Sequence, residues 1–393
     1  MAKVSISMPP DSTFLSSAIY EGLLYLIKDY AVGLNLREIE FEDSFLSKAY
    51  ADLDDSKIDG LKIVMTGNDN INSKIFEKLG LNVQSRKTYY DLLRLLKENS
   101  RSILSRQKIE LELKISKKDV LIDVSKKSEG IAAPQILKID RYTGLSSLES
   151  AFTSNQLTLY VSAEAALISL LGIYSAFLSS IRQQEQNYYF FLFFSPDEVT
   201  KMLGSGEKGF VRKCMILKNK ASEELRSIIE NYPANELIAI DCALNLELRE
   251  LLRAENLEKI AMLLFKIAPE GQTYKIYAYK IYEVLPIEIY GDMKFYDIAA
   301  RYFDAERLTK NLIEAISPQG AILRALSTLN KRNRFAEAEN VLSAVQGLYR
   351  FVTLGDAQGY FEFLQNLNDA CRKAENESRS RAEEYRKLIS KLR

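Results

Sequence analysis

The sequence predicts an α+β fold in which a mixed α/β front and a central sheet are followed by an all-helical C-terminal unit. The chain has 393 residues, a length that suggests two or three structural units. Patterns typical of strands occur up to about residue 292; one of them, the apolar run Tyr188–Phe194, is typical of a strand buried on both faces. Beyond that point the patterns are helical. We therefore expect a mixed α/β region at 1–130, a central sheet with a buried helix and a β-hairpin at 131–292, and a helical domain at 293–393.

Composition restricts the chemistry that the chain can perform. It has no histidine, so Ser–His and Cys–His pairs, an imidazole base and histidine metal ligands are excluded. The 53 basic residues balance 53 acidic ones, so attraction to nucleic acid or membrane must come from local patches. Cys214, Cys242 and Cys371 are far apart, which favours a reducing, cytoplasmic location over a disulfide framework or a zinc site. We expect no cofactor and no enzymatic activity.

Caps and periodicity predict the elements of the first region. Asp11 and Ser12, which follow two prolines, are expected to cap a helix from about Thr13 to Tyr30. Further elements are expected along the chain: a strand at 61–66, helices at 71–79 and 88–98, and a hairpin of strands 108–115 and 120–124 with one solvated face.

The central region begins with a loop-rich stretch at 125–156 and a strand at 157–161. A helix is expected next, from about Ala163 to Gln184. Its part from Ala165 to Ile181 carries no charge and approaches the length of a membrane span. Its serines and the apolar strand that follows favour a buried core helix and no contact with a membrane.

Turn and cap signals divide the remainder of the chain. Ser195-Pro-Asp-Glu198 is a capping box with proline at the first helical position, so a helix is expected to start there. The later elements are a helix at 222–231, a hairpin of strands 257–267 and 274–284, and helices at 293–302, 304–316, 320–330, 334–352 and 357–391. Gly347, Gly355 and Gly359 weaken the helical pattern. The last 22 residues suggest a solvated helix with a frayed end, or one that orders on a partner.

Two motifs could carry catalysis, and both have a simpler interpretation. Asp52 and Asp54 have the D-x-D spacing that suits Mg²⁺, but they lie in a polar loop, where solvated acids are favoured. The stretch Gly204–Gly209 partly matches a phosphate-binding loop. It follows a predicted helix, however, and Lys208 precedes a glycine where the motif requires Ser or Thr. We interpret this stretch as a flexible end of the helix.

A second interpretation of this stretch is a mobile basic loop that contacts phosphates. Residues 205–221 contain five basic side chains and one acidic one. The basic ones are Lys208, Arg212, Lys213, Lys218 and Lys220. Small glycines and several cations could approach a nucleic-acid backbone closely. From this stretch we choose Lys208, Arg212 and Lys213 as candidate phosphate contacts.

Two further surpluses of positive charge are candidates of the same kind. Residues 81–127 carry a net charge of +6 and end with Lys126 and Lys127, although the alternation of the hairpin equally suits an ordinary solvated sheet face. Lys331, Arg332 and Arg334 lie between two predicted helices, where they could contact phosphates or serve only capping and solubility.

The predicted hairpin at 257–284 contains four tyrosines that could stack on bases, namely Tyr274, Tyr277, Tyr279 and Tyr282. Aromatic side chains are also favoured in strands for packing alone. Packing is the preferred interpretation of these tyrosines.

The order of these elements resembles a known family. A mixed α/β front, an apolar helix, the strand Tyr188–Phe194 that continues into Ser195-Pro-Asp-Glu-Val, and a helical unit with Gly347-Leu-Tyr-Arg350 look like the large subunit of archaeal type I-A CRISPR surveillance complexes (Cascade). The resemblance implies a subunit that helps recognise and hold target DNA while guide RNA reads the sequence. It implies guide RNA, target DNA and other effector subunits as partners, and it assigns no individual residue.

Three hypotheses of function follow. The leading one is a non-catalytic, nucleic-acid-binding subunit of an RNA-guided CRISPR antiviral defence complex. The second is a structural scaffold whose helical C-terminus packs against a protein partner in another intracellular assembly. The third is a carboxylate–metal enzyme centred on Asp52 and Asp54.

Overall fold

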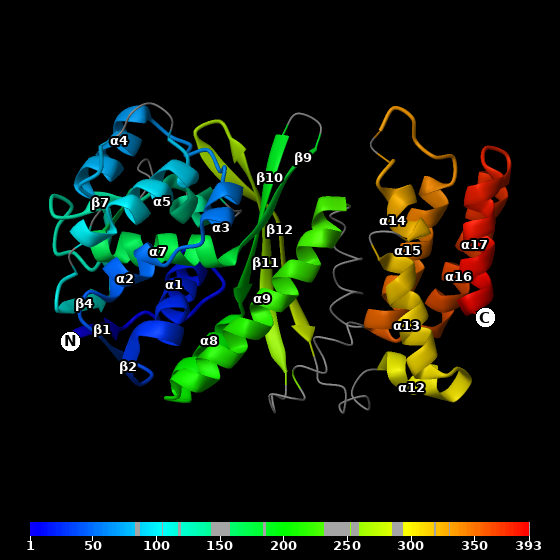
Figure 1. The fold of residues 1–393 in the computed structure, drawn as a ribbon, viewed down its shortest axis with the longest axis horizontal. Coiled ribbons are helices and arrows are strands. Elements are labelled where there is room, and N and C mark those ends of the chain that lie inside the picture. The colour runs from blue at the N-terminus through cyan, green and yellow to red at the C-terminus, as the bar shows by residue number, and fades with distance from the viewer. Residues whose placement is uncertain are drawn as a thin grey trace. The chain divides into compact units, whose positions relative to one another are not determined.

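The fold is described from a computed structural model, for residues 1–82, 87–103, 105–116, 119–142, 158–183, 186–231, 252, 259–284, 294–317, 320–329 and 331–392. Helices and strands mix in the first part and the C-terminal part is helical, so the predicted α+β class is confirmed (Figure 1). The chain forms two compact units, Met1–Lys218 with Ala261–Ile281, and Asn219–Ile260 with Tyr282–Arg393. These limits differ from those of the three expected regions, because strand pairing returns Ala261–Ile281 to the first unit.

Two small sheets lie in the N-terminal part of the first unit. One has the order β2-β3-β1-β4 and consists of β1 (Ala2–Ile6), β2 (Ala31–Leu34), β3 (Glu38–Phe41) and β4 (Lys108–Leu111). β1 is antiparallel to β3 and parallel to β4. The other has the order β5-β6-β8-β7 and consists of β5 (Leu113–Ser116), β6 (Asp119–Ile122), β7 (Ile131–Ala132) and β8 (Thr158–Val161).

The strand expected at 108–115 is in fact two strands in two different sheets. The Glu112 N–H donates to the Glu110 carbonyl at 2.8 Å, so the backbone turns between β4 and β5 and leaves the first sheet. β5 and β6 form the antiparallel part of the expected hairpin. The lysines expected at its turn lie outside the described residues.

A third sheet forms the core of the first unit, with the order β12-β11-β10-β9. Its strands are β9 (Phe177–Gln183), β10 (Gln186–Phe194), β11 (Ile260–Glu270) and β12 (Thr273–Val284). The buried strand expected at Tyr188–Phe194 is confirmed, because β10 has a neighbour on each side and its last six side chains are at most 2% exposed. β11 and β12 form the expected hairpin, and Gly271 at its turn has a positive φ of 59°.

Two helices, α1 (Phe14–Tyr30) and α7 (Ala163–Ala176), pack against each other and against β10 (Figure 1). Phe14 places its ring edge-on to Phe191, Phe193 and Phe265, with centroids 5.3–5.4 Å apart. The N-cap of α1 is Thr13, whose Oγ1 accepts from the Ser16 N–H. The expected caps Asp11 and Ser12 are therefore one or two residues too early, although Asp11 accepts from the Thr13 N–H.

The helix expected from Ala163 to Gln184 ends at Ala176. Phe177 has extended backbone angles, and the chain continues as β9, which pairs antiparallel with β10. Pairing with the aromatic strand overrides the local helical pattern of this uncharged stretch. Among the described helices, none has the length and apolar character needed to cross a membrane.

Short helices complete the first unit: α2 (Phe45–Ala51), α3 (Asp55–Gly60), α4 (Asp69–Lys78), α5 (Tyr89–Glu98), α8 (Pro196–Gly204), and the 3₁₀ segments η1 (Ser100–Ser102) and η2 (Gln135–Tyr142). Ser195 caps α8 by accepting from the Glu198 N–H, as expected. The strand expected at 61–66 is wrong, because the only ladder contact described for that stretch is a single bridge between Val64 and Thr88.

The second unit is helical where it is described, apart from the ends of two strands of the third sheet. Residues 219–231 of α9 (Lys208–Asn231) lie in this unit. Its other helices are α12 (Lys294–Tyr302), α13 (Ala305–Ile316), α14 (Ala321–Leu326), α15 (Ala338–Leu354), α16 (Ala357–Glu375) and α17 (Arg379–Leu392) (Figure 1). The helix expected at 357–391 is two helices, since the chain turns between Glu375 and Arg379 so that α17 can pack on α16. α17 buries Tyr385, Ile389 and Leu392, so the expected solvated helix is wrong for that face.

Candidate nucleic-acid interface

The turn between α14 and α15 presents three of the predicted basic residues. Lys331, Arg332 and Arg334 are all exposed. Arg334 Nη1 donates to Glu339 Oε1 at 2.8 Å. In the described part of the chain, Lys331 and Arg332 have no carboxylate within ion-pair distance. The turn therefore carries two uncompensated positive charges, which is the electrostatic requirement for contact with a phosphate backbone.

Buried contacts lie at the two ends of this turn. The hydroxyl of Thr328, a residue that is 6% exposed, accepts from the Phe335 N–H at 3.1 Å and donates to the Ala325 carbonyl at 2.7 Å. The Arg381 guanidinium lies 3.8 Å from the centre of the Phe335 ring, and its Nε is 3.1 Å from an oxygen of the buried Glu337. Because both ends of the turn are tied to the helical core, a ligand would order only the tips of the basic side chains.

The basic loop expected at 205–221 is a helix over most of its length. α9 (Lys208–Asn231) begins immediately after Glu207, so the interpretation as a mobile loop is wrong. Lys208 Nζ donates to the carbonyls of Asp29 and Ala31 at 2.7 and 3.2 Å. Its ammonium therefore compensates the carbonyl end of α1, which makes it a poor candidate for phosphate contact.

Arg212 and Lys213 are better candidates for phosphate contact than Lys208, because both are exposed on α9. Ile216, one turn further along, is 58% exposed, so the outer face of this helix is mixed in character. Two adjacent cations on such a face form a weaker basic patch than the turn at 331–334.

Lys218, from the same stretch, is fully buried and cannot reach a phosphate. Its Nζ donates to Glu21 Oε1 on α1 and to the Leu192 carbonyl on β10, and lies 5.3 Å from the centre of the Phe194 ring. Ser175 Oγ donates to the same Glu21 oxygen at 2.5 Å. Burial lowers the pKa of Lys218, against the opposing effect of Glu21. Glu21 inside the apolar pattern of α1 was the available sequence signal for this ion pair.

Lys126 and Lys127 lie on the exposed loop after β6. Lys126 Nζ is 3.4 Å from Glu129, which offsets part of its charge. No ion-pair partner of Lys127 occurs among the residues that the structure describes. These two lysines belong to the first unit and the turn at 331–334 to the second.

A second charge cluster, which sequence reasoning missed, joins two sheets to α7; its carboxylates are buried and its guanidinium is half exposed. Arg106 Nε lies 2.9 Å from Glu164, and the same guanidinium contacts Asp123. Ser162, the N-cap of α7, donates to Asp123 at 2.6 Å. Asp123 has a φ of 56°, unusual for a residue other than glycine, and burial raises the pKa of its carboxyl. Its carboxylate oxygens accept from described neighbours, which indicates a structural connection.

Of the four tyrosines on β12, two are buried and two are exposed. Tyr274 and Tyr282 are at most 4% exposed, and Tyr274 donates to the Val64 carbonyl. Tyr277 and Tyr279 are 46% and 45% exposed. The idea of a four-ring stacking surface is therefore wrong for the two buried tyrosines.

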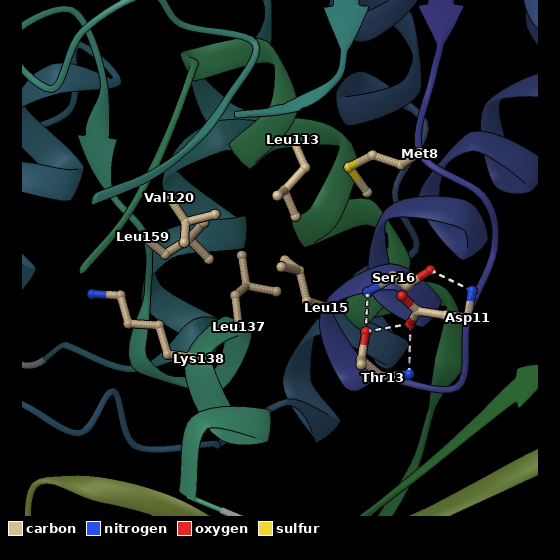
Figure 2. A pocket seen from close by; sticks show the side chains of 10 residues that line it. All are labelled: Met8, Asp11, Thr13, Leu15, Ser16, Leu113, Val120, Leu137, Lys138 and Leu159. Carbon is tan, nitrogen blue, oxygen red and sulfur yellow. Dashed lines mark hydrogen bonds between the residues drawn. The ribbon is translucent and has the colours of Figure 1, made fainter. Parts of the chain in front are cut away.

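A pocket of about 250 Å³ lies beside the N-terminus of α1 (Figure 2). Its lining is mostly apolar and comes from the segment before α1, from α1, from η2 and from three strands; the residues are Met8, Asp11, Thr13, Leu15, Ser16, Leu113, Val120, Leu137, Lys138 and Leu159. Figure 2 shows that Asp11, Thr13 and Ser16 are hydrogen-bonded to one another at one side of the pocket. Such a pocket suits an apolar group, and Asp11 and Lys138 are the two charged side chains in its lining.

The candidate acids have structural partners, and the described thiols are buried. Asp54 caps α3 by accepting from the Ser56 and Lys57 N–H groups, and Asp52 accepts from the Tyr30 hydroxyl at 2.6 Å. Across the residues that the structure describes, no group of acids and cysteines is arranged to hold a metal ion. Cys214 and Cys371 are buried free thiols, and burial raises the pKa of Cys214 to about 12. Cys242 lies outside the described residues.

Comparison with known proteins gives one extensive match. The chain is 48% identical over 398 residues to an uncharacterized protein of Archaeoglobus fulgidus, and the alignment covers 100% of both chains. No family model and no solved structure matches the chain. Identity of this extent over the full length of both chains is the mark of one family. The chain belongs to the same family as this archaeal protein.

Proposed function

We propose that the chain is a non-catalytic, nucleic-acid-binding subunit of an RNA-guided CRISPR antiviral defence complex, in which it helps recognise and hold target DNA. The observation that supports binding most directly is the turn at Lys331–Arg334, which is exposed, basic and tied to the core at both ends. The order of elements expected from the sequence resembles that of the large subunit of type I-A complexes. This resemblance supports the proposal that the chain is a subunit of such a complex.

The turn suits a backbone contact better than base reading. Lys331 and Arg332 are exposed cations on a turn, and contacts of this kind to phosphates position a protein without reading sequence. In an RNA-guided system sequence is read by base pairing, so a subunit with local basic contacts on a charge-neutral body is compatible with that division of labour. A non-catalytic role is supported by the absence of histidine and by the structural partners of Asp52 and Asp54.

The first test is the salt dependence of DNA binding. The double variant Lys331→Glu/Arg332→Glu should bind duplex DNA more weakly, and the slope of log K against log salt should fall by roughly 1.8, about 0.9 for each lost phosphate contact. Fluorescence anisotropy of a labelled duplex measures the affinity and its salt slope. The salt concentration is varied from about 50 to about 200 mM, a range over which phosphate contacts change affinity strongly.

A matched control separates a specific contact from a change in net charge. Lys310→Glu/Lys387→Glu changes the charge equally at two exposed positions of the same unit and should leave the slope nearly unchanged. Equal weakening in both double variants, or in neither, would remove the assignment of the turn. Isolation of guide-length RNA with the full chain and its neighbouring gene products tests the assembly separately.

The scaffold hypothesis is favoured by a different observation. Tyr302, Leu354 and Phe361 in the second unit are 74%, 59% and 63% exposed, and exposed apolar side chains of this size often mark protein contacts. The single variant Phe361→Ser should reduce co-purification of protein partners while DNA affinity is retained. Loss of DNA affinity with intact partner binding would count against the scaffold role.

A further inference from the structure

We propose that the pocket beside the N-terminus of α1 binds a small amphiphile, whose apolar body fills the pocket and whose ammonium head faces Asp11. The inference is separate from the proposed nucleic-acid function. All the lining residues belong to the first unit, whereas the basic turn at 331–334 belongs to the second.

The volume of the pocket sets the size of the apolar body. It is about 250 Å³. An apolar cavity of about 150 Å³ holds benzene, so in proportion this pocket holds a body of about ten carbon-sized atoms. A body of this size is a medium-length alkyl chain or a small substituted ring.

One continuous apolar face forms the wall of the pocket on the side of the sheet. Val120 on β6 is opposite Ile115 on β5 and next to Leu159 on β8 in register, so the three side chains point to the same face. Leu159 is 5% exposed and Leu137, on η2, is 1% exposed. The inner end of the pocket is therefore part of the hydrophobic core.

The pocket opens to solvent beside β5. Leu113 lines the pocket and is 42% exposed, and Ile115, two residues further along the strand, is 70% exposed. β5 is the outermost of the described strands of its sheet. A chain-like ligand can therefore enter at this edge and cover apolar surface that is in contact with water.

Asp11 gives the opening a negative charge. This residue is exposed, and its Oδ1 accepts from the N–H and the hydroxyl of Thr13 at 2.8 and 2.5 Å. Among the residues that the structure describes, none places a basic group within ion-pair distance of Asp11 and none donates to its Oδ2. An ammonium head would supply both the counter-charge and the donors.

The other charged lining residue, Lys138, lies away from the opening. It is 6% exposed, and Figure 2 shows it on the far side of the pocket from Asp11, with its nitrogen directed away from the leucines. A carboxylate head that reached Lys138 would have to leave water, which is costly, whereas a head at Asp11 stays partly solvated. The pocket therefore favours an ammonium over a carboxylate.

The first test varies the probe and uses the full chain in isothermal titration calorimetry. Alkylammonium ions from butyl to dodecyl should gain about fourfold in affinity for each added methylene and stop gaining near about nine carbons, where the pocket is full. Octylammonium, 1-octanol and octanoate share one chain length. Octylammonium should bind about tenfold more tightly than octanoate, because Asp11 attracts one head and repels the other.

The second test varies the pocket. Asp11→Asn keeps the oxygen that accepts from Thr13; it should remove the preference for octylammonium over 1-octanol and leave the affinity for 1-octanol unchanged. Asp59→Asn, at an exposed position of the same unit, is the matched control and should bind like the parent chain. Val120→Phe should weaken all three probes, by about fourfold for each methylene that the ring displaces.

Thermal unfolding of each variant without probe checks that the fold is retained. Leu113→Phe, at the exposed opening, replaces Val120→Phe if the latter lowers stability. Octanoate that binds as tightly as octylammonium, or an Asp11→Asn chain that still prefers octylammonium, overturns the proposal. Affinity that keeps rising up to dodecylammonium, or that survives the phenylalanine variants, indicates adsorption elsewhere and also overturns it. A chain that neither binds nor is stabilised by any of the probes overturns it outright.

Discussion

Two pairs of helices cross by the same close packing: α1 with α7 in the first unit, and α15 with α16 in the second. In each pair a glycine from one helix faces a glycine of the other. A Cβ on Gly22 would lie 1.8 Å from the Ile168 carbonyl oxygen, and one on Gly347 would lie 2.8 Å from the Gly359 carbonyl oxygen. Both crossings therefore need glycine for close backbone approach, but the first is much tighter.

The ion pairs beside the two crossings differ in burial. Beside the first, Glu21 and Lys218 form a fully buried ion pair next to Gly22. Beside the second, Arg350 pairs with Asp356 and Glu362 while remaining 40% exposed. A buried pair depends strongly on both partners, whereas an exposed network is screened by water. The comparison indicates that the first unit tolerates change less at its helix crossing than the second.

The largest expected effect is that of Gly22→Ala. The added methyl would overlap the backbone of α7, which cannot move without shifting the sheet that it covers, so we expect a loss of roughly 3 kcal/mol or more in the free energy of unfolding. Denaturant titration measures the loss. Gly209→Ala is the control, since a Cβ there meets nothing within 4 Å. Equal stabilities for the two variants would show that α1 and α7 do not cross this closely.

Lys218→Met should lower stability by a similar amount. Removal of the ammonium leaves the Glu21 carboxylate buried without its counter-charge, which costs about 3–5 kcal/mol when no other group compensates. The double variant Glu21→Gln/Lys218→Met should recover most of that loss in the same unfolding assay. Arg212→Met, at an exposed position of the same helix, should change stability by no more than about 0.5 kcal/mol. A single variant as stable as this control would contradict the buried ion pair.

The smallest of the three effects is expected for Gly347→Ala. The Cβ would be about 1 Å less crowded than at Gly22, and alanine gains helix propensity, so a loss of about 1–3 kcal/mol is expected. Thermal unfolding of the Gly347 and Gly22 variants, measured side by side, ranks the two crossings. A larger loss at Gly347 would reverse the comparison between the units.

Much of the local structure could be predicted because its causes lie within a few residues. Ser195 caps α8 where the capping box predicted it, the helix expected at 88–98 is α5, and the apolar run of β10 is buried as expected. The exposed turn at 331–334 was predictable for the same reason, since a cluster of like charges between two helices is costly to bury and is therefore expected at the surface.

The candidate site was predictable only in part. The sequence shows that Lys208, Arg212, Lys213 and Lys218 are close along the chain, but not that Lys208 would bind the carbonyl end of α1 or that Lys218 would be buried against Glu21. Likewise, four tyrosines in a hairpin do not reveal which two face solvent. Those outcomes depend on which element packs on each face, and the packing elements are distant from these residues along the chain.

The sequence by itself determined the class of the fold, the cap of α8, the central strand and the absence of imidazole chemistry, because these follow from residue type and short-range pattern. Only the tertiary structure decided that α7 ends at Ala176, that Gly22 and Gly347 mark close crossings rather than weak helices, and which basic residues remain available to a phosphate. The physical reason is that strand pairing, backbone approach and charge burial are long-range interactions, and their free energies outweigh the local preferences that a sequence pattern records.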